Sequence, residues 1–277
     1  MRLPRTPHSA DVVERRGFNY PRAFYIYFKV QTIMTYCVGV MVDAGMVFAS
    51  DSRTNAGVDN ISRFRKMRIF QRASDRVIVI LSSGNLSITQ NSVNLLEQGA
   101  ADGSGAANIW NVNSMFNVAE LIGQSLRSVR ERDVPFLSQG NVDSGASFVV
   151  GGQIHGERQR LFNVYSEGNF IEATPETPYF QIGESKYGKP VIDRVVNRYT
   201  NLYDAAKCIM VSFDSTMRSN ISVGLPIDMV WYDNNSLSVR LERRIEEDDA
   251  YFNLIHTQWG EGLKRVFAQL PNPDWTS

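Results

Sequence analysis

Hydrophobic runs in this sequence occur in neighbouring pairs, and each pair is separated by a few polar or glycine residues. The first pair covers residues 35–42 and 46–50 around Asp43-Ala44-Gly45, and the last covers residues 227–232 and 237–241. Runs of this length joined by turn residues predict antiparallel strand pairs. Two more pairs are predicted, at 67–70 with 77–81 and at 146–150 with 161–165, the latter around a turn at Gly151-Gly152.

Apolar residues at helical spacing fill the stretches between these strand pairs. The first predicted helix is capped by Asn85 and ends near residue 96, and the second covers 118–126. A third helix is predicted over 191–196 with Pro190 in its first turn, and a fourth over 203–217. The last is an amphipathic C-terminal helix over 252–270. Residues 99–105 are predicted to form a loop. Because the strands pair through local turns, the pattern favours an α+β fold with antiparallel sheets covered by helices over a Rossmann fold.

Composition narrows the classes of function. Lys plus Arg total 29 and Asp plus Glu total 29, so the basic excess typical of nucleic-acid binders is absent. Cys37 and Cys208 do not form a C-x-x-C motif, which argues against a zinc or redox site, and we expect no metal. No apolar run is long enough to span a membrane or to form a secretion signal, so we expect a cytoplasmic protein without a membrane partner.

The sequence gives little support to catalysis by a histidine base. The three histidines are His8, His155 and His256, and none lies in a motif for a Ser-His-Asp triad. A hydroxyl nucleophile without histidine can use its own α-amine as the base, provided that it is the first residue of the chain. Thr35 follows Met34 and begins the first predicted strand, so it is the candidate for this role.

The start of this strand pair resembles the opening of proteasome β subunits and of their bacterial ring-protease relatives. The segments that carry the resemblance are Thr35-Tyr36-Cys37-Val38-Gly39-Val40, Asp43-Ala44-Gly45 and Val47-Phe48-Ala49-Ser50-Asp51-Ser52-Arg53. Asp51 follows Thr35 by 16 residues, as the catalytic aspartate of that family does, and Lys66 follows by 31, one fewer than usual. Residues 50–60, 82–86 and 214–220 are most similar to the bacterial ancestral-β-subunit branch, Anbu, and the resemblance covers about residues 34–270.

The resemblance implies a four-layer αββα sandwich of the N-terminal-nucleophile (Ntn) hydrolase class with two antiparallel sheets and no cofactor. It implies Thr35 as the nucleophile, with Asp51 and Lys66 as its catalytic partners. The resemblance also implies auxiliary residues. The backbone N–H that binds the oxyanion would be that of Leu81 or Ser82, and the position of a family serine corresponds to Glu184 or Ser185. A later Asp and Ser of the family are displaced to Asn220 and Ser222.

Residues 1–33 differ from the rest because their prolines and arginines follow no periodic pattern. We expect a leader here, either a propeptide or a stretch upstream of the true start, followed by one hydrolase domain over 34–277. The alternative is an ordered extension used for assembly in an inactive protein.

Three functions follow as hypotheses. The first is a threonine hydrolase that cleaves peptide or amide bonds inside a homo-oligomer, as a ring or an open spiral. The second is a self-assembling scaffold with little proteolysis, and the third is an amidase on a small non-peptide substrate. An unfoldase partner is left open by the sequence.

Overall fold

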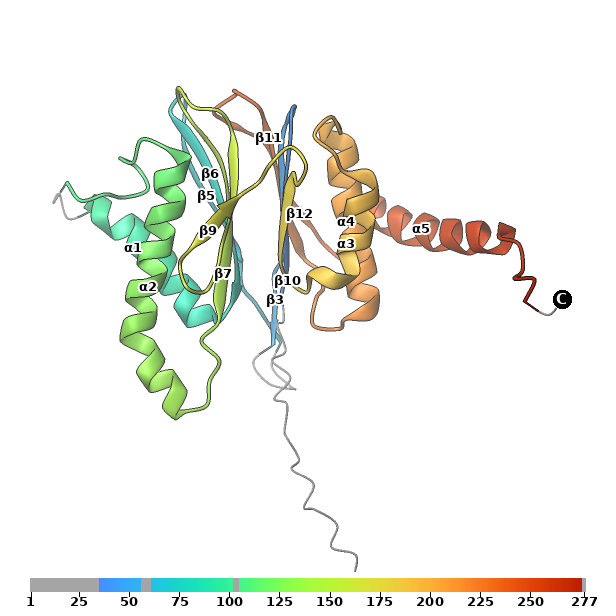
Figure 1. The fold of residues 1–277 in the computed structure, drawn as a ribbon, viewed down its shortest axis with the longest axis horizontal. Helices are drawn as coiled ribbons and strands as arrows, with labels where there is room; N and C mark the ends of the chain where they lie inside the picture. Colours follow the sequence, from blue (N-terminus) through green and yellow to red (C-terminus); the bar gives the residue numbers. More distant parts are fainter. Residues whose placement is uncertain (1–34, 56–60, 102–104, 276–277) are drawn as a thin grey trace, which may run out of the picture. The chain divides into compact units, whose positions relative to one another are not determined.

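The computed structural model describes residues 35–55, 61–101 and 105–275. Two five-stranded antiparallel sheets stack face to face, and helices cover their outer faces (Figure 1). This arrangement confirms the expected α+β fold with four αββα layers. Among the helices that the structure describes, none combines the length and the apolarity that a membrane span needs.

The first sheet carries the candidate nucleophile. Its strand order is β10-β1-β2-β11-β12. The strands are β1 Tyr36–Val42, β2 Gly45–Asp51, β10 Tyr179–Gly183, β11 Ile227–Asp233 and β12 Val239–Ile245. Helices α3 (Ser185–Val195) and α4 (Leu202–Ser219) cover its outer face, and α5 (Ala250–Gln269) packs against α4 through Phe252 and Ile255.

The second sheet has the strand order β5-β6-β7-β8-β9 and is covered by α1 (Leu86–Ala101) and α2 (Met115–Gln139). Its strands are β5 Met67–Arg72, β6 Arg76–Gly84, β7 Ala146–Ile154, β8 Arg160–Val164 and β9 Phe170–Glu172. Two short strands, β3 Arg53–Asn55 and β4 Ile61–Arg63, form a separate ribbon after β2.

The inner faces of the two sheets meet in one apolar cluster, which includes Phe48 of β2 and Val149 of β7. The predicted turn at Gly151-Gly152 is wrong, because both glycines lie inside β7 and the chain turns after Ile154. A Cβ at Gly151 would lie 2.7 Å from the Phe48 ring. These glycines therefore serve the close approach of neighbouring chain segments rather than a turn.

Other boundaries also differ from the prediction. α1 continues through Ala101, into the predicted loop, and α3 begins at Ser185, so Pro190 lies inside the helix and not in its first turn. The C-terminal helix buries its first turns only. Leu263 and Val266 are 53% and 57% exposed, although they continue the predicted apolar stripe.

Candidate functional site

The β1–β2 hairpin brings Asp51 next to the start of β1. Cys37 pairs with Ser50 across the hairpin, so Asp51 lies opposite Tyr36. The Tyr36 N–H donates a hydrogen bond of 3.0 Å to Asp51 Oδ1. Thr35 directly precedes β1 and is 6% exposed. The short hairpin turn thus places the aspartate beside the candidate nucleophile, although Asp51 lies 16 positions after Thr35 in the sequence.

Lys66 reaches the same carboxylate from the second sheet. Its Nζ lies 2.8 Å from Asp51 Oδ1 and 2.5 Å from the Arg53 carbonyl oxygen. The Lys66 side chain is 6% exposed and the Asp51 side chain is fully buried. The structure therefore brings together the three residues predicted as catalytic, from the start of β1, the end of β2 and the residue before β5.

Burial dominates the electrostatics of this pair. Removal from water raises the pKa of Asp51 to about 6, although the Lys66 charge and the backbone N–H donors act in the opposite direction. Burial and the charge of Asp51 also raise the pKa of the Cys37 thiol well above its usual range. A thiol held in its neutral form is a poor nucleophile, so Cys37 fits a packing role.

Glu184 approaches Thr35 from the adjacent strand. The Glu184 N–H donates a hydrogen bond of 2.8 Å to the Thr35 carbonyl oxygen. Gly183 makes this approach possible, because its φ is +82° and a Cβ there would lie 2.0 Å from that oxygen. Ser185 is the first residue of α3, one position further along the chain. Of the two predicted serine positions, Glu184 is the one bonded to Thr35.

Leu81 and Ser82 lie on β6, the strand that pairs with β5 and contacts the Lys66 backbone. Leu81 is buried in the cluster between the sheets. The Ser82 N–H donates to the Lys66 carbonyl oxygen at 2.9 Å, and the Ser82 hydroxyl donates to the same oxygen at 3.2 Å. Ser82 therefore fixes the backbone of the lysine, and an oxyanion role for its N–H requires that bond to open.

Asn220 and Ser222 follow the end of α4. Asn220 Oδ1 accepts a hydrogen bond of 2.9 Å from the Ser222 N–H. The loop contacts Arg53, whose guanidinium donates to the Ile221 carbonyl oxygen at 3.1 Å. The Arg53 carbonyl oxygen in turn accepts the hydrogen bond from Lys66, so Arg53 links this loop to the Thr35 cluster.

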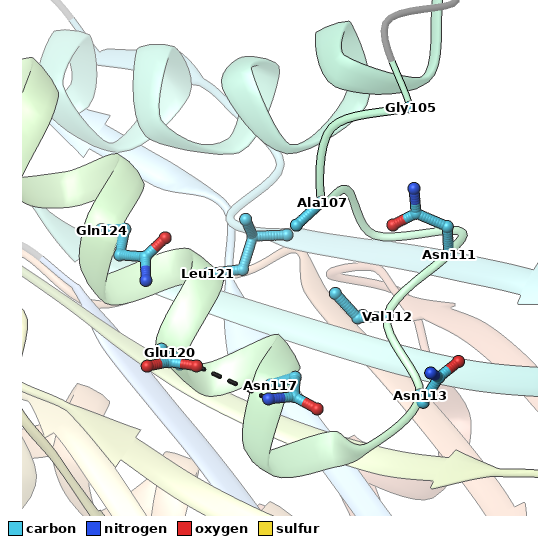
Figure 2. Close-up of a pocket in the computed structure, with 9 residues that line it drawn as sticks. All are labelled: Gly105, Ala107, Asn111, Val112, Asn113, Asn117, Glu120, Leu121 and Gln124. Carbon is cyan, nitrogen blue, oxygen red and sulfur yellow. Dashed lines mark hydrogen bonds between the residues drawn. The ribbon is translucent and has the colours of Figure 1, made fainter.

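A small hollow of about 40 Å³ lies beside Lys66 and is lined by Arg65, Arg68, Ser82, Thr89 and Gln90 with apolar neighbours. Another hollow of about 430 Å³ lies between α2, which contributes Asn117, Leu121 and Gln124 to its lining, and the segment 105–113, which contributes Asn111 and Asn113 (Figure 2). None of the predicted catalytic residues lines the second hollow.

The described residues contain no cluster of three or more His, Cys, Asp or Glu side chains placed to hold a metal ion. The sequence did not reveal two contributors to the site, the Tyr36 amide and the Arg53 carbonyl. Both act through the backbone, so their residue types carry no signal. The β1–β2 register, read from the paired hydrophobic runs, was the one available clue to Tyr36.

Comparison with known proteins identifies the family of this chain. No protein-family model matches the chain, and neither does any curated protein. Among solved structures, Anbu (ancestral beta-subunit) from Yersinia bercovieri is 50% identical over 87% of this chain and 100% of its own, with a TM-score of 0.81. The chain belongs to the Anbu family.

Two further Anbu structures support this assignment. Anbu from Pseudomonas aeruginosa, in a helical assembly, is 46% identical over 87% of this chain and 99% of its own, with a TM-score of 0.82. Anbu from Hyphomicrobium sp. strain MC1 is 42% identical over 87% of this chain and 100% of its own, with a TM-score of 0.80. The predicted resemblance to the Anbu branch is therefore confirmed.

Proposed function

We propose that this Anbu protein is a threonine-type Ntn hydrolase whose nucleophile is the Thr35 hydroxyl. The observation that carries the proposal is the buried Lys66–Asp51 ion pair, 2.8 Å long, which is bonded to the N–H of Tyr36, the residue after Thr35. Burying two charges is costly, and such pairs are concentrated at sites where the charge has a function. A solvated basic face, the ordinary role of a lysine among arginines, does not account for a side chain that is 6% exposed.

The chemistry assigned to the three residues is acyl transfer. The α-amine of Thr35 removes the proton from the hydroxyl, whose oxygen attacks the carbonyl carbon of a peptide or amide bond. The C–N bond of the substrate breaks and the amine leaves with that proton. Lys66, held by Asp51, stabilises the negative charge that develops. Water then hydrolyses the ester and restores Thr35.

This mechanism requires Thr35 to be the first residue of the working protein. An amide nitrogen is not a base, so an attached leader leaves the hydroxyl without its proton acceptor. We therefore propose that residues 1–34 are absent from the active form, through translation from Met34 and its removal or through cleavage of a propeptide. The hydrolase domain then begins at Thr35.

We further propose that the chain assembles with copies of itself through its outer helices. The Pseudomonas aeruginosa relative forms a helical assembly. In this chain the outer half of α5 presents apolar side chains, with Phe267 76% exposed. A contact whose rotation does not divide a full turn gives a spiral rather than a closed ring. Such an assembly also favours the second candidate function, a scaffold with little proteolysis.

A substrate panel tests the hydrolase proposal. Protein whose N terminus is verified as Thr35 is incubated with peptides and with small non-peptide amides, in parallel with Thr35→Ala. We expect turnover by the parent protein and none above background by the variant, and the substrate that is cleaved separates a peptidase from an amidase. Equal turnover in both proteins contradicts the assignment, and no turnover with assembly intact favours the scaffold.

A further inference from the structure

We propose that the Glu184 carboxylate binds the Thr35 α-ammonium group in the processed protein and so sets the pH above which Thr35 can act as its own base. This inference rests on the proposed function, because it concerns the free α-amine. Glu184 is a positioning residue in this account, since it acts on the amine and not on the substrate.

The pairing of β1 with β10 brings Glu184 next to Thr35. Cys37 pairs with Ile182 and Tyr36 with Gly183, and the 2.8 Å bond from the Glu184 N–H to the Thr35 carbonyl oxygen extends the pairing by one residue. This bond holds the Glu184 backbone against Thr35, and a glutamate side chain is long enough for its carboxylate to reach the nitrogen of Thr35.

The carboxylate also has a weakly satisfied acceptor. The Glu184 side chain is 13% exposed, and its Oε2 is buried without a hydrogen bond within the described part of the chain. The same Oε2 forms a long ion pair of 3.5 Å with Lys186 Nζ, on a side chain that is 68% exposed. Although Glu184 is the N-cap residue of α3, its side chain makes no capping bond. A distance of 3.5 Å is long for a hydrogen bond, so an ammonium group at Thr35 can supply this oxygen with a closer donor.

The other charges around Thr35 leave this role to Glu184. Asp51 approaches from the end of β2 and Lys66 from the residue before β5, and these two are paired with each other. The Arg53 guanidinium is bonded to the Ile221 carbonyl oxygen. On β6, Ser83 is uncharged. The N-terminal end of α3 favours a negative charge at its cap position, where Glu184 lies.

An anion beside an amine favours its protonated form. The ordinary pKa of an α-amine is about 8, so Glu184 moves the onset of its basicity further above neutral pH. Only the unprotonated amine can accept the hydroxyl proton. Glu184 therefore holds the amine in place and, at neutral pH, restrains the nucleophile.

The test measures the titration of the α-amine directly. The full chain, with a specific protease site placed directly before Thr35, is folded, cut and studied by NMR with ¹³C-labelled threonine. We expect Glu184→Gln to lower the midpoint of the Thr35 titration by about one pH unit, which is about a tenfold gain in unprotonated amine at neutral pH. Glu261→Gln, a change at an exposed glutamate of α5, is the matched control and leaves the midpoint unchanged.

A second variant keeps the test decisive if Glu184→Gln does not fold. Lys186→Ala removes the competing cation from an exposed side chain, so the midpoint should rise. Unchanged midpoints in the variants that fold overturn the inference. Because this titration needs no turnover, a shifted midpoint without hydrolysis contradicts only the proposed function. Where hydrolysis is seen, the acidic limb of kcat/KM should move with the midpoint.

Discussion

Lys66 Nζ lies 2.8 Å from Asp51 Oδ1, with both side chains buried. The aspartate ends β2 and the lysine precedes β5, so this ion pair links the two sheets where these strands end and begin. The Tyr36 N–H and the Arg53 carbonyl oxygen complete the polar surroundings of the pair. A pair held in this way has a fixed geometry, and the loss of either member leaves an uncompensated buried charge.

Lys66→Ala should therefore reduce the free energy of unfolding by about 3–5 kcal/mol, because Asp51 loses its partner. The double variant Asp51→Asn with Lys66→Met should be more stable than Lys66→Ala, since neither charge remains. Urea unfolding of the three proteins measures the difference. Lys264→Ala, which removes an exposed ion pair with Glu261, is the control and should change stability by less than about 1 kcal/mol. If the double variant is no more stable than Lys66→Ala, the pairing is wrong.

The raised pKa of Asp51 gives stability a defined pH dependence. The pKa of an aspartate in an unfolded chain is about 3.9, whereas burial raises the pKa of Asp51 in the folded protein to about 6. The folded state thus binds the Asp51 proton more tightly than the unfolded state does. The stabilisation of the folded protein by protonated Asp51 is therefore fully present below about pH 4 and is lost as the pH rises through about 6. The wild-type protein should lose stability relative to Asp51→Asn between these pH values. Parallel stability curves for the two proteins would show that Asp51 does not titrate there.

Gly183→Ala tests the approach of Glu184 to Thr35. A Cβ at this position would lie 2.0 Å from the Thr35 carbonyl oxygen, and the φ of +82° is unfavourable for alanine. We expect a loss of about 2 kcal/mol or more in stability, together with the loss of hydrolysis. Gly260→Ala on α5, where a Cβ meets no atom within 4 Å, should instead be neutral or stabilising. Unfolding curves and turnover of both variants decide the point.

The assembly proposal concerns the exposed apolar face of α5. Replacing Val266 and Phe267 by Glu should lower the particle mass measured by light scattering and leave the circular dichroism spectrum unchanged. Gln258→Glu with Gln269→Glu adds the same charge to polar positions of α5 and should leave the mass unchanged. A mass that stays equal to the wild-type value in the first variant places the contact elsewhere.

Local pairing made much of the fold predictable. The β1–β2 and β11–β12 hairpins each join two hydrophobic runs through a few turn residues, which is a short-range signal. β10 was missed because its partner β1 lies far away in the sequence. Gly151 was assigned to a turn because conformational freedom and close packing both select glycine, and the sequence alone does not separate the two. The ring of Phe48 reveals which one applies.

The site was predictable to a similar degree. The spacing of Thr35, Asp51 and Lys66 resembled a known family, and the structure places these residues together. Glu184 was expected at a serine position, yet its contact with Thr35 depends on the β1–β10 pairing and on Gly183. The leader falls outside the described residues, so its removal stays a prediction.

Covalent labelling tests the central claim most directly. Protein from its native source is treated with an electrophile that acylates N-terminal threonine, and the product is analysed by intact mass and by peptide mapping. We predict one adduct per chain, on a chain that begins at Thr35 and on Thr35 itself, with no adduct in Thr35→Ala. A chain that begins at Met1 and still hydrolyses substrate, or an adduct that persists in Thr35→Ala, would contradict the account.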